Sequence, residues 1–311
     1  MMNQNSDSDA GTPWPAFTPA RPVTVVGAGV MGTMVAWACA NAGLWTRLYE
    51  IDAGRAALAR RQIEQWLGCP AEKLEICNGL RAAVSGAQLV FENVPENLAL
   101  KSDVLGRIHA VAGPETYIGS NTSSLRCAAL ARASGRPERF FNMNFCDPRA
   151  SSLTELMQCA ETAPQTIRFA KAWGRHLGMV VLHVRKDQKG YSHNRLWRVI
   201  KKEVLRQIDQ SIATPEDIDR GWMLSFESDI GPCGIMDAVG LSTILGVEES
   251  YFRDSGDEAD RPPQILVQMV ADGKLGVQSG EGFYTYPDPA YRKPGFLQPD
   301  AAGGSQGAPS G

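Results

Sequence analysis

A glycine-rich turn near the start of the chain constrains its fold more than any other part of the sequence. The β-prone run Val23–Val26 leads directly into residues 27–32 (GAGVMG), and an apolar helical pattern follows over residues 31–42. In such a unit the first glycine permits a tight turn, the second lets the backbone approach a pyrophosphate, and the third allows close helix–strand packing. The helix N-terminus adds free N–H groups and a partial positive charge. We therefore expect a dinucleotide to contact Gly27, Gly29, Val30, Met31 and Gly32.

An acidic residue at the end of the next strand indicates which dinucleotide binds. The strand-like run over residues 46–50 ends with Glu50, 23 residues after Gly27. A carboxylate there hydrogen-bonds the ribose hydroxyl groups of NAD and repels the additional phosphate of NADP. Arg47 and Arg55 lie nearby in the sequence and weaken that preference. The motif predicts NAD as the cofactor. The alternative is a glycine turn in another α/β fold that binds no phosphate.

Strand-like and helical patterns alternate up to about residue 184, and helical patterns alone follow. Such alternation predicts a parallel sheet covered by helices on both faces. Thr214 is a suitable N-cap for a helix that follows the amphipathic run over residues 194–212. Further strand candidates are residues 89–94, 117–120, 140–145 and 180–184. We expect a Rossmann-type doubly wound α/β domain over residues 21–187, an all-helical domain over 188–296, and disordered tails over 1–20 and 297–311.

Length and composition restrict the class of protein. A chain of 311 residues is long enough for two domains. The net charge is −3 and no tract is polybasic, so we expect no nucleic-acid partner. No apolar run is long enough to predict a membrane span, and residues 1–22 lack the pattern of a secretion signal. Seven cysteines without CxxC spacing are typical of reduced thiols rather than a disulfide framework or a metal site. We expect a cytoplasmic protein without a membrane partner.

Several segments resemble, in order and spacing, those of the 3-hydroxyacyl-CoA dehydrogenase family, which includes lambda-crystallin-like and carnitine-type dehydrogenases. In the first half these are residues 91–97 (FENVPEN) with Lys101, residues 120–125 (SNTSSL) and residues 136–140 (RPERF). In the second half they are residues 190–196 (GYSHNRL), 231–232, 237–241 and 280–284. The resemblance covers residues 22–286. It implies a Rossmann-type domain followed by a helical domain that forms a homodimer.

The same resemblance implies roles for individual residues. In the family, a histidine and a glutamate transfer the proton while hydride passes between the substrate carbon and the nicotinamide. Ser123 and Asn194 match the family positions that hydrogen-bond the substrate oxygen. Glu96 and Lys101 match positions that border the nicotinamide end of the cofactor, and Asn121 lies in the same cofactor-binding segment as Ser123.

An asparagine occupies the position of the family histidine. Residues 142–148 read NMNFCDP, which places Asn144 at that position and leaves Glu155 as the carboxylate partner. An amide does not titrate near neutral pH, so Asn144 can hydrogen-bond an oxygen but cannot act as a general base. Loss of general-base catalysis costs roughly 10²–10⁴ in rate. Four alternatives stay open: His193 as the acid or base, Glu155 or Asp147 acting through water, and no dedicated base.

The segment between Glu50 and Glu96 bears on the substrate. Its 46-residue interval is shorter than in family members that carry a Lys-rich helical hairpin for CoA. Binding energy from a CoA tail normally aligns such a substrate, so the short interval favours a small acid or an acyl group on a carrier protein. Arg149 is a candidate partner for a free carboxylate.

Together these features predict an NAD-dependent oxidoreductase with altered proton-transfer residues. Its substrate would be a small molecule, a 3-hydroxy acid or a hydroxyacyl thioester of CoA or a carrier protein. One alternative is a reductase of imines or other activated carbonyls. Another is a non-catalytic NAD-binding protein with a structural or sensing role.

Overall fold

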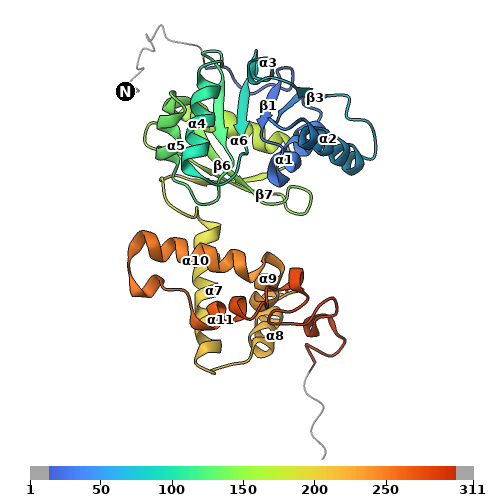
Figure 1. The fold of residues 1–311 in the computed structure, drawn as a ribbon, viewed down its shortest axis with the longest axis vertical. Helices are drawn as coiled ribbons and strands as arrows, with labels where there is room; N and C mark the ends of the chain where they lie inside the picture. The colour runs from blue at the N-terminus through green and yellow to red at the C-terminus, as the bar shows by residue number, and fades with distance from the viewer. Residues whose placement is uncertain (1–13, 299–311) are drawn as a thin grey trace, which may run out of the picture. The chain divides into compact units, whose positions relative to one another are not determined.

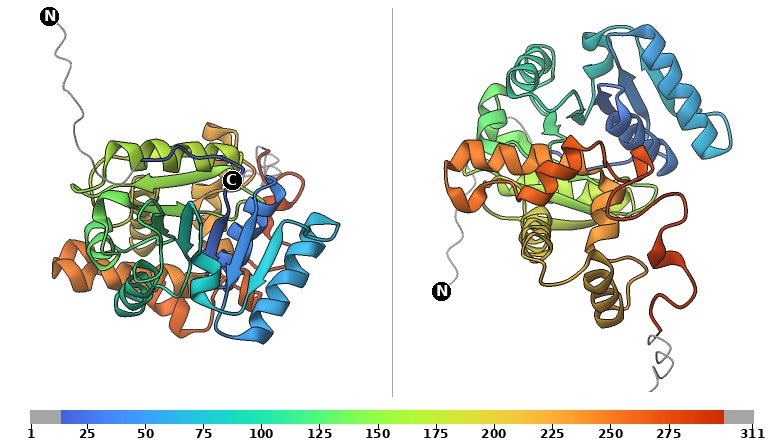
Figure 2. Two further views of the ribbon diagram at one scale, coloured as in Figure 1. Left: turned by 90° about the horizontal axis from the view of Figure 1, so that it is seen from above. Right: turned by 60° about the horizontal axis from the view of Figure 1, so that its bottom comes forward.

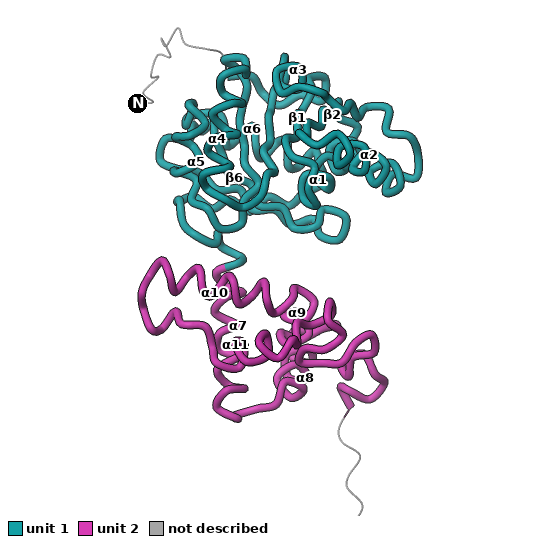
Figure 3. Tube along the Cα trace, viewed as in Figure 1, with its two compact units in different colours: residues 1–194 teal, residues 195–311 magenta. Residues whose placement is uncertain are grey.

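A computed structural model describes residues 14–298, and the chain divides between Asn194 and Arg195 into two units (Figure 3). The domain boundary expected after residue 187 therefore lies inside the first unit. The tail expected over residues 297–311 lies outside the described residues except for residues 297 and 298. In the part of the chain that the structure describes, no helix combines the length and apolar character that a bilayer crossing requires.

The first unit is built around one eight-stranded sheet (Figure 1). Its strands are β1 (Val23–Val26), β2 (Thr46–Tyr49), β3 (Leu74–Cys77), β4 (Leu89–Glu92), β5 (Tyr117–Ser120), β6 (Phe140–Phe145), β7 (Leu153–Met157) and β8 (Val180–Val184). They lie in the order β3-β2-β1-β4-β5-β6-β7-β8. The order reverses between β1 and β4, which is the switch point where doubly wound sheets bind ligands. The predicted Rossmann-type α/β fold is confirmed.

Helices cover both faces of this sheet (Figures 1 and 2). They are α1 (Val30–Asn41), α2 (Ala53–Leu67), α3 (Leu80–Val84), α4 (Leu98–His109), α5 (Cys127–Ala133) and α6 (Pro164–His176), with a 3₁₀ turn at Pro137–Arg139. Side chains alternate along a strand. Val23 and Val25 therefore pack in the core under α1, α2 and α6, whereas Val26 packs in the core under α3, α4 and α5. Burial on both faces explains why the strands form short apolar runs.

The sequence pattern does not predict β3 or β7, and β7 changes the character of the sheet. It runs antiparallel to β6, so the expectation of a purely parallel sheet is wrong at this point. Only residues 146–152 join the two strands, whereas a parallel crossover needs a dozen or more residues. Thr154 and Glu155 interrupt the apolar run of β7, which conceals it in the sequence. β8 then pairs parallel to β7.

Residues 14–21, here called the strap, pack on the sheet at the amino-terminal ends of its strands. The side chain of Gln88, just before β4, accepts from the Thr18 N–H at 3.1 Å and donates to the Thr18 carbonyl at 2.7 Å. The Phe17 ring lies edge-on to Phe169 of α6, with 5.9 Å between the centroids. The disordered tail expected over residues 1–20 is therefore wrong for residues 14–20. Residues 1–13 lie outside the described residues.

The second unit is helical, as predicted. Its helices are α7 (His193–Asp209), which begins two residues before the unit boundary, α8 (Pro215–Phe226), α9 (Pro232–Val239), α10 (Leu241–Ser255) and α11 (Gln264–Ala271), with 3₁₀ turns at Glu258–Asp260, Val277–Ser279 and Ala290–Arg292. The predicted N-cap is confirmed, because Thr214 Oγ1 accepts from the Asp217 N–H at 3.1 Å. Leu205, Met236 and Leu266 lie in the core that joins these helices.

Candidate active site

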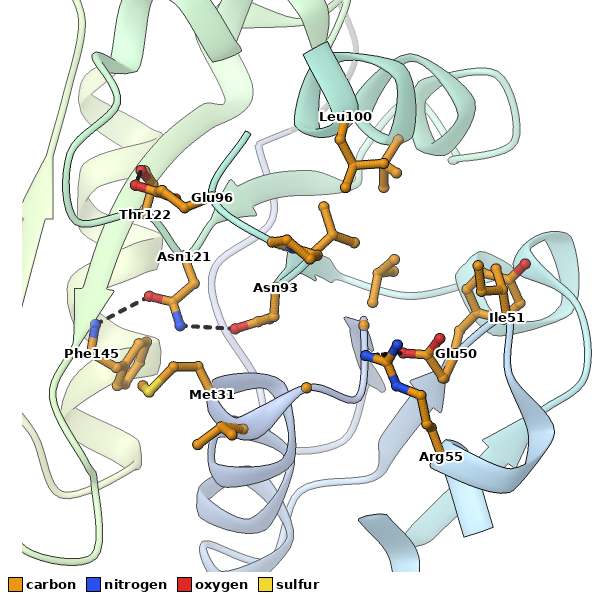
Figure 4. Close-up of a pocket in the computed structure, with 18 of the residues that line it drawn as sticks. Met31, Glu50, Ile51, Arg55, Asn93, Glu96, Leu100, Asn121, Thr122 and Phe145 are labelled. Atoms are coloured by element: carbon orange, nitrogen blue, oxygen red, sulfur yellow. Dashed lines mark hydrogen bonds and ion pairs between the residues drawn. The ribbon is translucent and has the colours of Figure 1, made fainter. Parts of the chain in front are cut away.

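A pocket of about 730 Å³ opens at the carboxyl-terminal edge of the sheet. Its walls come from the turn after β1, the end of β2, the segments after β4 and β5, and the end of β6 (Figure 4). Doubly wound sheets bind their ligands at this edge. Of the residues that the sequence predicts for the site, Gly27, Gly29, Val30, Met31, Glu50, Glu96, Asn121, Ser123 and Asn144 line the pocket. Gly32, Lys101, Glu155, His193 and Asn194 do not line it.

The glycine turn leaves the start of α1 open to the pocket. Gly27 has a φ of +97°, a backbone conformation that favours glycine. A Cβ on Gly32 would lie 1.9 Å from the Gly27 carbonyl oxygen, so α1 can approach the turn only because Gly32 has no side chain. Gly29 is the N-cap of α1, and no side chain caps the helix there. Since a Cβ on Gly29 would meet no atom within 4 Å, the first amides of α1 are accessible to a phosphate.

Glu50 is fixed at the mouth of the same turn (Figure 4). Its carboxylate accepts from the Ala28 N–H at 2.8 Å and from the Asp52 N–H at 3.2 Å. Arg55 also lines the pocket, with its guanidinium 3.8 Å from the Glu50 carboxylate. These contacts hold the carboxylate where a ribose hydroxyl group would meet it.

Two asparagines join the ends of β4, β5 and β6 (Figure 4). The Asn121 amide donates to Asn93 Oδ1 at 2.9 Å, and its own oxygen accepts from the Phe145 N–H at 3.4 Å. All three residues line the pocket. Asn93 is not among the site residues predicted from the sequence, although a polar residue directly after the buried run of β4 is a signal that could have found it.

Lys101 is fully buried and is not among the residues that line the pocket, and its expected place beside the nicotinamide stays a prediction. Its ammonium group donates to both carboxylate oxygens of Glu92, at 3.0 and 3.1 Å. It also donates to the main-chain oxygens of Val94 at 3.0 Å and Asn121 at 2.8 Å. The Ser120 hydroxyl donates to Glu92 at 2.6 Å. Lys101 and Glu92 therefore hold together the segments that follow β4 and β5, which carry pocket residues.

Glu96 organises the loop that carries Ser123. Its Oε1 accepts from the Thr122 hydroxyl at 2.6 Å, from the Ser123 N–H at 3.2 Å, and from the Ser124 N–H and hydroxyl at 3.0 and 2.7 Å. Its other carboxylate oxygen lies 3.7 Å from the Lys101 ammonium group. Glu96 thus lines the pocket while it fixes the backbone on which Ser123 is presented.

Asn144 and Glu155 lie opposite each other in the register of β6 and β7. Asn144 lines the pocket, and among residues 14–298 no hydrogen bond to its side-chain amide is found. Glu155 is 1% exposed, and its Oε1 accepts from the N–H groups of Ser192 at 2.9 Å and His193 at 2.8 Å. The two positions are therefore neighbours, but the carboxylate is bonded to the chain at the start of α7.

His193 and Asn194 form the first turn of α7. The His193 side chain is exposed, and that of Asn194 is partly buried. Asp147 is held by Arg149, whose guanidinium donates to it at 2.6 and 2.9 Å. These hydrogen bonds lower the pKa of Asp147, so this carboxyl is ionised near neutral pH. Arg149 also lies 4.0 Å above the Trp66 ring, which leaves it less suited to capture a free carboxylate than the sequence suggests.

Comparisons with known proteins identify the family. The family profile described as "3-hydroxyacyl-CoA dehydrogenase, NAD binding domain" matches residues 22–188, and the profile "3-hydroxyacyl-CoA dehydrogenase, C-terminal domain" matches residues 190–286. The chain belongs to the 3-hydroxyacyl-CoA dehydrogenase family. The strap over residues 14–21 precedes both matches.

Individual relatives of this family member match most of its length. It is 31% identical over 280 residues to a "Probable 3-hydroxybutyryl-CoA dehydrogenase" of Deinococcus radiodurans, a match that covers 84% of this chain and 99% of the relative. It is 29% identical over 281 residues to the "5-formyl-3-hydroxy-2-methylpyridine 4-carboxylate 5-dehydrogenase" of Mesorhizobium japonicum, which covers 86% and 91% of the two chains. The crystal structure of (S)-3-hydroxybutyryl-CoA dehydrogenase from Ralstonia eutropha matches with a TM-score of 0.80 and 29% identity, covering 86% of this chain and 99% of that chain.

This 3-hydroxyacyl-CoA dehydrogenase family member is an NAD-dependent dehydrogenase, and its residues fit the cofactor. The open amides of α1 suit the pyrophosphate, and Glu50 suits a ribose. Asn93, which lies against the glycine turn, and Asn121 and Ser123 line the same pocket after β4 and β5. When bound, NAD supplies the hydride acceptor or donor of the reaction.

Proposed function

We propose that this dehydrogenase transfers hydride between NAD and a 3-hydroxy acid or hydroxyacyl thioester through a site in which Asn144 replaces the family histidine. The main support for this proposal is the position of Asn144. It lines the pocket at the end of β6, opposite Glu155 in the strand register. Its side-chain amide makes no hydrogen bond to residues 14–298, so it is available to a ligand. Ser123 lines the same pocket and supplies a hydroxyl.

Asn144 and Ser123 would bind and orient the reacting oxygen. The asparagine amide donates through Nδ2 or accepts through Oδ1, and the serine hydroxyl does either. Neither group takes up a proton near neutral pH, so the proton would be exchanged with water. Relative to an imidazole at the same place, we expect a rate lower by roughly 10²–10⁴.

The connection between α2 and β3 bears on the substrate. Gly68 ends α2 in a left-handed conformation, and only residues 68–73 separate it from β3. This short connection leaves no room for the helical hairpin that family members with a CoA-binding arm carry. The Mesorhizobium relative is named for a pyridine carboxylate rather than a CoA thioester. Both observations favour a small acid or a carrier-bound acyl group over a free CoA thioester.

Reduction of imines is a second candidate, and Asn144 is the observation that favours it. A protonated imine already carries the proton that its amine product needs, so hydride addition requires no side-chain acid. The relatives named as dehydrogenases support an enzyme rather than the non-catalytic role that the sequence leaves open.

The decisive experiment follows NADH oxidation by absorbance with acetoacetyl-CoA, for the native protein and Asn144→His, over about pH 6–9. If the site accepts the CoA thioester, we expect slow or undetectable native turnover and a gain of about 100-fold or more in the variant, with a new limb near the pKa of histidine. Rapid native turnover would overturn the view that no dedicated base is present. If both proteins bind NADH but neither oxidises it, the CoA thioester is excluded, and small hydroxy acids are tested next.

We also propose a homodimer formed through the second unit, because several of its large apolar side chains are exposed. Leu224 and Phe226 of α8 are 57% and 64% exposed. Leu266 and Met269, by contrast, lie in the core of this unit and are not available for association. Sedimentation at micromolar concentration should give twice the chain mass, and a monomer would contradict the proposal.

A further inference from the structure

Two carboxylates, the partly buried Asp187 and the buried Glu155, hold the connection between the sheet and α7. Asp187 accepts from the N–H groups of Cys127 at 2.7 Å and Ala128 at 3.1 Å, at the start of α5. Glu155 of β7 accepts from the N–H groups of Ser192 and His193, which follow Asp187 by five and six residues. The connection is therefore tied to the sheet unit on both sides of Gly190.

The backbone between these two anchors is strained. Gly190 and Tyr191 follow one another with φ values of +77° and +52°, and a residue with a side chain rarely adopts the second value. Tyr191 is 0% exposed and packs in the core under α4 and α5, with its hydroxyl group lacking a hydrogen-bond partner among the described residues. Such a conformation persists only where the surroundings impose it.

We propose that Glu155 is a positioning residue that fixes residues 192–193, and with them Asn194, rather than a group that carries the proton. Its Oε1 already holds the two N–H groups that begin α7, where a negative charge is also favoured by the helix dipole. The residue opposite it is Asn144, which has no imidazole for a carboxylate to orient. The inference rests on the proposed function only in taking Asn194 as a substrate contact.

Hydrogen exchange of the amides of residues 192–194, followed by mass spectrometry or NMR, tests the positioning role without any substrate. Glu155→Leu removes the acceptor, and exchange should rise about tenfold or more. Glu155→Gln keeps a side-chain oxygen for both N–H groups, and exchange should change by less than about threefold. Unchanged exchange in Glu155→Leu would overturn the proposal, and Glu155→Ala replaces that variant if it does not fold. Glu203→Leu, at an exposed position of the same helix, is the matched control.

Turnover separates positioning from proton transfer. With the substrate that the native protein turns over, Glu155→Gln should keep kcat within about fivefold and leave the pH profile unchanged, whereas Glu155→Leu should raise KM. A loss of about 100-fold or of one limb of the pH profile in Glu155→Gln, with unchanged exchange, would make Glu155 the proton carrier and overturn the proposal. If no substrate is turned over, the proposed function fails, but the exchange experiment still decides the role of Glu155.

Discussion

At the amino-terminal edge of the sheet the strap covers the strand ends, whereas at the carboxyl-terminal edge the strand ends surround an open pocket. The Tyr117 ring, at the start of β5, stacks on Phe169 at 3.9 Å, and its hydroxyl donates to the Pro15 carbonyl at 3.0 Å. Arg139, just before β6, lies 4.0 Å above the Trp14 ring. The strap thus packs on, and hydrogen-bonds to, side chains at the starts of these strands.

The carboxyl-terminal edge also contains a dense polar network, but part of it is left for a ligand. Glu92 and Lys101 are bonded to each other and buried. Asn144, Ser123 and the first amides of α1 face the pocket. Parallel strands bring the turns after them, and the N-termini of the helices that follow, to this one edge. The strap contacts and the Glu92–Lys101 pair therefore stabilise the fold, whereas Asn144, Ser123 and the first amides of α1 are available to a ligand.

The largest effect is expected from Lys101→Met, which removes one partner of the buried ion pair beneath this network. Glu92 would be left as a buried charge without its cation, a change that typically costs about 3–5 kcal/mol. Urea denaturation measures the loss. Lys293→Met removes an exposed ion pair with Asp288 and should cost less than about 1 kcal/mol. Equal losses in the two variants would show that the pair is not structural.

Phe17→Ala tests the strap. The ring packs between Phe169 and His176, and its removal should lower the free energy of unfolding by about 2 kcal/mol. The dissociation constant of NADH, measured by fluorescence, should not change, because the strap lies at the opposite edge from the pocket. Weaker NADH binding would contradict the separation of the two edges.

Gly29→Ala and Gly32→Ala separate cofactor binding from folding at the pocket edge. A Cβ on Gly29 meets no protein atom, so Gly29→Ala should keep the native melting temperature while NADH binding weakens about tenfold, or about 1.4 kcal/mol. Gly32→Ala should lower the melting temperature and also weaken NADH binding, because its Cβ would collide with the Gly27 carbonyl oxygen. A native NADH affinity in Gly29→Ala would indicate that no phosphate lies against this turn.

The smallest effect concerns His183 of β8, the last strand in the sheet order. Burial and the charges of Lys171 and Arg185 lower its pKa below the ordinary value of 6.5. The unfolded chain then binds the proton at a higher pH, so His183 contributes stability that is present above about pH 6.5 and is lost as the pH falls below it. His183→Gln should flatten the stability curve between about pH 5 and 7 by less than 1 kcal/mol. The exposed His193→Gln is the control, and a similar flattening there would contradict the assignment.

The Rossmann-type fold, the helical second unit and the cofactor turn could all be predicted from the amino-acid sequence. These features depend on neighbours in the chain: the glycines at positions 27, 29 and 32, the apolar strands, and the Thr214 cap. Local chemistry fixes them because a tight turn or a helix start involves only a few consecutive residues. The family motifs also marked Asn144 and Glu155 as partners, which the register of β6 and β7 brings opposite each other.

The contacts of the buried polar groups could not be predicted from the sequence, because they depend on how the chain packs in three dimensions. Lys101 binds Glu92 and two carbonyl oxygens instead of bordering the pocket, and Glu155 holds the amides at residues 192 and 193. The packing of the strap on Phe169 likewise joins segments about 150 residues apart. A buried charge must find partners wherever the folded chain brings them, and these partners lie far away in the sequence.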